Sequence, residues 1–222
     1  MTNVGRLSVC AAVALVLAAA PAAAAIGVSV DVLWRPNPSD DLQVGLHLTN
    51  LIFPQPRENV VEFFPQMQNP YEDYPVIAFI AHHARVTPES VWVYKLKGHK
   101  WSAVMLHFGV RPNILFVSLP QSPRPPYGNA YGYWKKHGDR MPVDQLTNDD
   151  IRFWVGLRTL SAYTGQDPAR VYEWNQSGRK YAQVAGAKYR EKHGKGPKMQ
   201  QAGMDGPGKG KGKGKGHDKD RD

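Results

Sequence analysis

The sequence predicts a mainly α-helical protein made of two related three-helix units, with a small amino-terminal β element and a disordered carboxyl-terminal tail. Three observations support this class: one stretch of the chain recurs at an offset of 80 residues, every aromatic residue lies between Trp34 and Tyr189, and residues 191–222 are rich in lysine and glycine. The 222 residues are 42% hydrophobic and carry a net charge of +9. This composition suits one domain or two small ones and excludes collagen-like, disulfide-scaffold and polytopic membrane proteins.

Residues 1–25 are predicted to be a secretory signal peptide. Arg6 precedes an apolar run, Leu7 to Ala20, which is shorter than the ~20 residues that span a membrane. The small residues before Ile26 place cleavage after Ala25. Cys10 is the only cysteine and would be removed, so we expect an exported, periplasmic or extracellular chain without disulfides. A lipid anchor is a weaker alternative, because Cys10 precedes most of the apolar run.

Residues 26–69 are predicted to contain the β element. Apolar and polar residues alternate over residues 28–33 and again over residues 42–48, with a turn-forming segment between them. This pattern predicts a β-hairpin, although Asp40 or Asp41 equally suits the cap of a helix beginning at Leu42. A short helix is predicted over residues 58–64.

The repeat places residues 87–104 over residues 167–184 without a gap. Proline, valine, glycine and lysine recur at identical offsets, and aromatic residues match at 92/172, 94/174 and 101/181. We interpret this as a duplicated helical unit, present at residues 70–110 and 147–190.

Each copy carries the marks of a helix followed by a second short helix. Thr87 or Asp167 is predicted to cap a helix whose first residue is proline. Gly98 or Gly178 is suited to the left-handed conformation that ends it. The second helix is predicted to start near residue 100 or 180.

A longer apolar helix is predicted before each of these pairs. The two segments are residues 76–84 and 151–163, and Thr147 and Asp150 form a capping-box-like pair before the second. Each unit therefore has three helices.

The linker, residues 111–146, is rich in proline and aromatic residues. Its apolar run, residues 114–119, is a candidate strand. The following Gly-rich segment suggests an aromatic and cationic surface for a glycan or anionic polymer. The candidate ligand residues are Tyr127, Tyr131, Tyr133, Trp134, Lys135 and Lys136. The favoured alternative is packing, in which these aromatic side chains hold the linker against the helices.

The two Pro-x-x-Val units, together with Pro-Pro-Tyr-Gly-Asn-Ala-Tyr-Gly-Tyr-Trp-Lys-Lys, resemble a group of exported bacterial proteins of unknown function. The resemblance covers roughly residues 70–192. It implies an envelope or secreted location and supplies no catalytic residues.

Residues 191–222 are predicted to be disordered, because alternating glycine makes ordering entropically costly. The repeated lysines are Lys209, Lys211, Lys213 and Lys215. The tail is interpreted as a solubilising extension, with a salt-sensitive arm for anionic polymers as the functional alternative.

More specific functions, such as DNA binding or metal binding, have weaker support in the sequence. A DNA-binding helix-turn-helix is disfavoured by export and by a second helix whose apolar residues are typical of a core. A metal site is not predicted, and His83, His99 and His107 would form one only through tertiary proximity.

The carboxylate pairs Glu58/Glu62 and Asp149/Asp150 suit helix starts and solvated faces, and a cell-wall or polysaccharide hydrolase remains the alternative. No cofactor motif occurs. The sequence thus predicts a non-enzymatic binding or structural protein of the cell envelope, with affinity for anionic polymers or glycans and no specific DNA partner.

Overall fold

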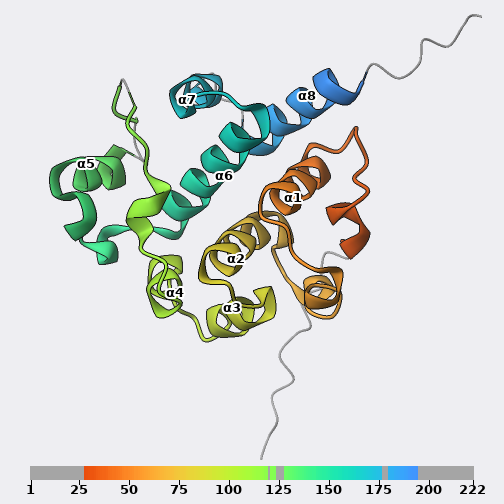
Figure 1. The fold of residues 1–222 in the computed structure, drawn as a ribbon, viewed down its shortest axis with the longest axis horizontal. Coiled ribbons are helices and arrows are strands. Elements are labelled where there is room, and N and C mark those ends of the chain that lie inside the picture. The colour runs from red at the N-terminus through yellow and green to blue at the C-terminus, as the bar shows by residue number, and fades with distance from the viewer. Residues whose placement is uncertain (1–27, 120, 124–127, 177–179, 195–222) are drawn as a thin grey trace, which may run out of the picture.

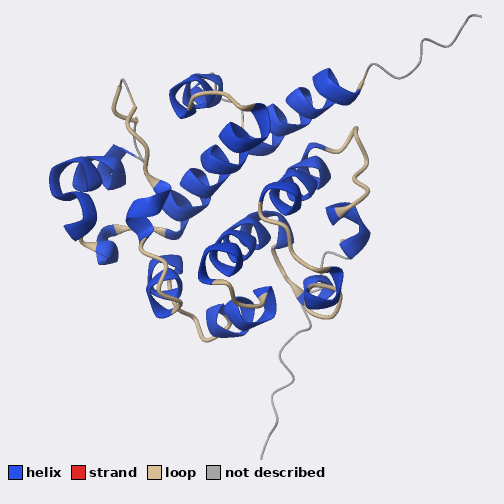
Figure 2. Cartoon of the chain, in the orientation of Figure 1, coloured by secondary structure: helices blue, strands red, loops and turns tan. Residues whose placement is uncertain are grey.

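The computed structural model describes residues 28–119, 121–123, 128–176 and 180–194. Within these residues all regular structure is helical and no strand occurs (Figure 2). The predicted mainly α-helical class is therefore confirmed. The predicted signal peptide, Tyr127 and the four repeated lysines of the tail lie outside the described residues.

The described chain contains α-helices linked by 3-10 turns. The α-helices are α1 (Asp41–Ile52), α2 (Pro70–Ala84), α3 (Pro88–Lys95), α4 (Trp101–His107), α5 (Gly128–His137), α6 (Asn148–Thr164), α7 (Pro168–Gln176) and α8 (Tyr181–His193). The 3-10 turns are η1 (Val30–Leu33), η2 (Arg57–Asn59), η3 (Phe64–Gln66), η4 (Pro112–Leu115), η5 (Gly138–Arg140) and η6 (Val143–Gln145). None of the described helices is long and apolar enough to cross a membrane.

Two rows of helices form the centre of the fold. In Figure 1, α6 and α8 follow one another along one diagonal, and α2 and α1 follow one another along a second diagonal beside it. Helix α1 packs against α8, and α2 packs against α6. A single apolar core includes the fully buried side chains of Trp101, Trp154 and Tyr74.

Helix starts are set by local side-chain caps. The Asp40 carboxylate accepts hydrogen bonds from the backbone N–H groups of Leu42 (2.9 Å) and Gln43 (3.2 Å) at the start of α1. Thr87 caps α3, and Thr147 with Asp150 forms a reciprocal capping box at α6. Such caps satisfy N–H groups that have no partner within the helix. The predicted caps at Thr87 and Thr147 are confirmed.

Helix boundaries recur at the offset of the sequence repeat. Helices α2 and α6 end 80 residues apart, and each is followed by a left-handed residue, Arg85 (φ 57°) and Gly165 (φ 66°). Helices α3 and α7 both begin at proline, and α4 and α8 both begin at an aromatic residue, at the same offset. The third helices pack differently, because α8 lies on α1 and α6 whereas α4 lies on α3 and α6.

The predicted amino-terminal hairpin is wrong. Residues 30–33 form the 3-10 turn η1, and residues 42–48 belong to α1. Helix α1 is enclosed by α2, α6 and α8, so Val44, Leu46 and Leu48 are all buried. A helix covered on several sides needs apolar residues around most of its circumference, which produced an alternation resembling that of a strand. The alternative start signal at Asp40 is correct, with α1 beginning at Asp41.

The linker prediction also needs correction. The apolar run at residues 114–119 forms no strand. The Arg158 guanidinium instead donates hydrogen bonds to the carbonyls of Ile114 (2.6 Å) and Leu115 (3.2 Å), so a side chain serves where a partner strand was expected. Burial in this position lowers the pKa of Arg158. Residues 58–64 lie across the turns η2 and η3 and do not form one short helix.

Candidate functional site

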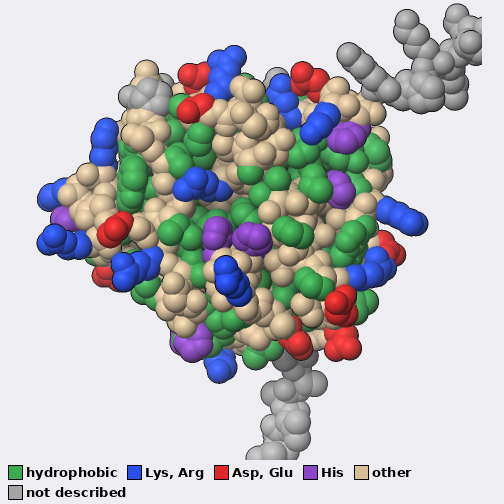
Figure 3. Space-filling view, in the orientation of Figure 1, with side chains coloured by type: hydrophobic (Ala, Val, Ile, Leu, Met, Phe, Trp, Pro, Cys, Tyr) green, Lys and Arg blue, Asp and Glu red, His purple; other side chains and the backbone are tan. Residues whose placement is uncertain are grey.

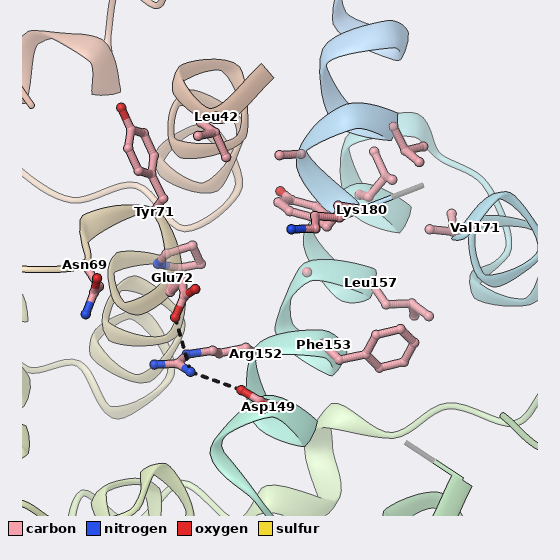
Figure 4. A pocket seen from close by; sticks show the side chains of 16 residues that line it. Leu42, Asn69, Tyr71, Glu72, Asp149, Arg152, Phe153, Leu157, Val171 and Lys180 are labelled. Atoms are coloured by element: carbon pink, nitrogen blue, oxygen red, sulfur yellow. Dashed lines mark hydrogen bonds and ion pairs between the residues drawn. The ribbon is translucent and has the colours of Figure 1, made fainter. Parts of the chain in front are cut away.

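The main cavity lies where the two helix rows meet. It has a volume of about 610 Å³ and is bounded by the first turns of α1, α2 and α8 and by one face of α6, with Val171 contributed by α7. Figure 4 shows these side chains converging on it from separate helices. Ligand cavities in proteins typically fall in the range of about 300–1,000 Å³.

The walls of this cavity differ in polarity. One side, formed by α6, α7 and α8, is apolar and consists of Phe153, Leu157, Leu160, Val171 and Val184. The facing side carries polar groups at the start of α2, namely Tyr71, Glu72 and the preceding Asn69, which lie across the cavity from Phe153 and Leu157 in Figure 4. The cavity is therefore amphipathic.

Arg152 organises the polar rim. Its guanidinium contacts the carboxylates of Asp73 (2.7 Å), Asp149 (3.1 Å) and Glu72 (3.3 Å), and it thereby ties α6 to α2. Burial opposes the charged form, yet the hydrogen bonds and charges of the three carboxylates outweigh it and raise the pKa of Arg152. The rim carboxylates are thus held in ion pairs, and Arg152 remains charged.

Tyr181 forms the back of the cavity because two helices leave room for its ring. A Cβ placed on Gly156 of α6 would lie only 3.1 Å from Cγ of Tyr181, and one on Gly45 of α1 would lie 3.6 Å from Cε1. The Tyr181 hydroxyl lies near those of Thr49 and Thr159 but makes no hydrogen bond of normal geometry with a described residue. Burial raises the pKa of Tyr181 to about 12, so the phenol is neutral.

Lys180 precedes α8 and projects its amine across the mouth of the cavity (Figure 4). It is exposed, and its backbone N–H donates to the Gln183 side chain (2.9 Å). Within the described part of the chain, Lys180 makes no ion pair. Its ammonium is therefore available to a ligand's polar end.

The lining of the cavity combines apolar side chains with a few polar and charged groups. The described residues lining it include no serine, threonine, cysteine or histidine. Its carboxylates, Glu72 and Asp149, are engaged with Arg152. An apolar wall with a few polar groups at one end can hold and orient a molecule.

Apart from Tyr127, which is not described, the residues predicted to bind a ligand lie elsewhere, on α5, and on different faces of it. Tyr131 is fully buried: its hydroxyl accepts from the N–H of Leu119 (2.8 Å) and donates to the Leu119 carbonyl (3.3 Å). Trp134 is half-buried and stacks on Phe116 at 5.6 Å. These two rings pack against linker residues, whereas Tyr133, Lys135 and Lys136 face solvent. Of the described part of the predicted set, only Tyr133, Lys135 and Lys136 are exposed, and their spacing on α5 does not place all three on one face.

The segment around α5 also differs from the extended linker that was predicted. Ala130, Tyr131 and Trp134 are spaced to share a helix face, which explains why these residues form a helix against the core. Gly128 accommodates a close backbone approach, because a Cβ there would collide with the carbonyl of Pro123. Gly132 has open space around it.

The histidines of the alternative metal site are separated by aromatic packing. His99 and His107 both stack on Tyr94, with centroid distances of 4.5 and 3.8 Å, and two rings so close must occupy opposite faces of the tyrosine. His83 packs against Phe79 at 4.4 Å. No group of three potential ligands suited to a metal ion occurs among the residues that the structure describes.

The cavity residues escaped sequence reasoning because they come from distant segments. Leu42, Phe153 and Lys180 gain a common role only through the packing of α1, α6 and α8. A weak indication existed in Gly45 and Gly156, since glycine inside a helix often marks close packing.

Comparison with protein-family models, curated proteins and solved structures finds no match for this chain.

Proposed function

We propose that this chain is an exported, non-enzymatic binding protein that holds a small amphipathic molecule in the cavity between α1, α2, α6 and α8. The observation that carries the proposal is the division of a cavity of about 610 Å³ into an apolar wall and a polar rim. Burial of each ligand methylene on the apolar wall would contribute about 0.8 kcal/mol.

The orientation of the ligand follows from the two walls. Its apolar body would lie against Phe153 and Leu157, and its polar end would face Tyr71 and Lys180. Because Arg152 and its carboxylates are paired with one another, Lys180 is the charged group of the described lining that is left to meet the ligand's polar end.

The test uses N-phenyl-1-naphthylamine, an apolar amine whose fluorescence rises on burial. We expect saturable enhancement with the wild-type protein. Leu42 lines the cavity and is 48% exposed, so Leu42→Glu should weaken binding by about fivefold without unfolding the chain.

Leu51→Glu is the matched control, since Leu51 lies on the same helix, is 56% exposed and does not line the cavity. An equal loss in both variants, or no saturable binding by wild type, would contradict the proposal.

Export is part of the same proposal and rests on the sequence of residues 1–25. Edman sequencing of the protein recovered outside the cytoplasm should begin at Ile26. A chain that retains Met1 would contradict it.

We also infer that the helices α2–α4 and α6–α8 derive from one duplicated unit. The ungapped match at an offset of 80 supports this, as do helix ends that recur at the same offset. A protein that carries only one copy of the three-helix unit would test this duplication directly, because its sequence could be compared with both copies.

Affinity for anionic polymers or glycans is the second candidate function. Two separate observations favour it: the exposure of Tyr133, Lys135 and Lys136 on α5, and the lysine-rich sequence of residues 191–222. Because α8 continues to His193, a tail deletion should begin after Gly194. Retention of this variant on an anionic matrix should fall. Retention equal to that of the wild type would exclude the tail as a binding site for anionic polymers.

A further inference from the structure

A second hollow lies on the outer side of the fold, where α6 ends and α7 passes over α8. Its volume is about 530 Å³. Tyr163 comes from the end of α6, Trp174 from α7, and Lys188 and Lys192 from α8. It shares none of its lining residues with the amphipathic cavity or with α5.

Two lysines of α8 each lie over an aromatic ring in this hollow. Nζ of Lys188 is 4.7 Å from the centroid of Trp174, and Nζ of Lys192 is 4.9 Å from the centroid of Tyr163. Lys188 and Lys192 are four residues apart and therefore project from the same face of α8. The hollow thus presents two ammonium groups above an aromatic floor.

The remaining lining groups extend this cationic character. Arg170 contributes a third positive charge, and Glu191 is the single acidic residue among the described lining residues. Glu191 accepts from Lys188 at 2.7 Å and Arg170 donates to Glu173 at 2.7 Å, whereas Lys192 makes no ion pair with a described residue. The net charge of the hollow is therefore positive.

Polar groups able to bind hydroxyls surround the rings. Gln166 and Thr164 lie at the edge of the hollow; the Thr164 hydroxyl donates to the Leu160 carbonyl (2.8 Å) and accepts from the Gln166 N–H (3.4 Å), and the Gln166 side chain is exposed.

We propose that this hollow binds an anionic saccharide. A sugar ring presents an apolar C–H face that suits Trp174, hydroxyls that suit Gln166 and Thr164, and an acidic substituent that suits Lys188 and Lys192. Charge-assisted hydrogen bonds to a carboxylate are the stronger kind. The cation–π contacts are weak at exposed positions, so the lysines can turn from the rings to the ligand at little cost.

The test is calorimetric titration of the full chain with a short oligogalacturonate, a chain of carboxylated sugars. Wild type should show saturable binding. Lys188→Gln/Lys192→Gln retains the apolar stems of the lysines and removes both charges, and it should weaken binding about tenfold or more. Trp174→Ala should weaken binding to a similar extent, and circular dichroism shows whether each variant is folded; Trp174→Phe replaces it if the alanine variant is not.

The matched control is Lys97→Gln/Lys100→Gln. Lys97 also lies over a tyrosine ring, 5.4 Å from the centroid of Tyr94, and the control removes the same charge elsewhere on the surface. Its affinity should remain within about twofold of wild type, because long-range charge effects are largely screened at physiological salt.

Three results would overturn the proposal: no saturable binding by wild type, an equal loss in the control, or a loss caused by Lys135→Gln/Lys136→Gln in place of the α8 variant. Polyphosphate distinguishes a sugar site from a general anion site. If it binds as tightly and with the same dependence on Lys188 and Lys192, the saccharide assignment is wrong. None of these results bears on N-phenyl-1-naphthylamine binding, so the two proposals fail independently.

Discussion

Replacing Tyr131 with phenylalanine tests whether the Tyr131 hydroxyl holds the linker at Leu119. In the native protein the Tyr131 hydroxyl accepts from the Leu119 N–H at 2.8 Å and donates to the Leu119 carbonyl at 3.3 Å. Tyr131 is 0% exposed and Leu119 is 4% exposed, so water cannot replace the lost oxygen. Tyr131→Phe leaves a buried backbone N–H without a partner.

The expected loss follows from these contacts. An unsatisfied buried donor costs about 1–3 kcal/mol, and the longer second bond adds little, so the free energy of unfolding should fall by about 2 kcal/mol. For a domain of this size the midpoint temperature should fall by about 4–8 °C.

Urea unfolding with an unchanged m-value measures this loss, and hydrogen exchange locates it, because the Leu119 amide should exchange faster. Tyr133→Phe is the control: Tyr133 is 38% exposed, and its change should stay within about 0.5 kcal/mol. If Tyr131→Phe changes stability by less than about 0.5 kcal/mol and Leu119 stays protected, the role of the Tyr131 hydroxyl in holding the linker is refuted.

Three further predictions concern stability. Arg85 and Gly165 occupy equivalent left-handed positions (φ 57° and 66°). In urea unfolding, Arg85→Gly should therefore stabilise the protein by about 0.5–1 kcal/mol, and Gly165→Ala should destabilise it by about 1 kcal/mol. Changes of the opposite sign would contradict the strain argument. Gly156→Ala gains helix propensity but places a methyl 3.1 Å from Tyr181, so thermal unfolding should show a net loss of about 1 kcal/mol, and a net gain would mean that the ring yields. Burial, together with the electrostatic effect of His82 and Arg158, lowers the pKa of His83 below 6.5, so the unfolded chain takes up this proton first as the pH falls. The stability lost on acidification below about pH 6.5 should therefore be smaller in His83→Gln, and an unchanged pH profile would contradict this.

Local signals in the sequence were sufficient to predict several helix boundaries. Thr87 with Pro88, and Thr147 with Asp150, act on backbone groups within one turn, so their geometry follows from the adjacent residues alone. Gly98 adopts the expected left-handed conformation (φ 87°) after α3 for the same reason.

Errors arose where packing overrides the local pattern. The alternation at residues 42–48 predicted a strand, but α1 is covered on several sides and buries Val44, Leu46 and Leu48 together. Residues 114–119 lack a neighbouring strand and are held by Arg158, a residue more than forty positions away. The grouping of aromatic residues around Tyr131 likewise did not reveal which rings face the core.

The sequence by itself determined the mainly helical class, the capped starts of α3 and α6 and the recurrence at 80 residues; the caps depend on hydrogen bonds and dihedral preferences that act within a few residues. Tertiary structure decided the rest. Leu42, Arg152 and Lys180 acquire a shared cavity, and Trp174 acquires Lys188, only when α1, α2 and α6–α8 pack together. Contacts over such separations depend on how whole helix faces fit, which no local pattern encodes.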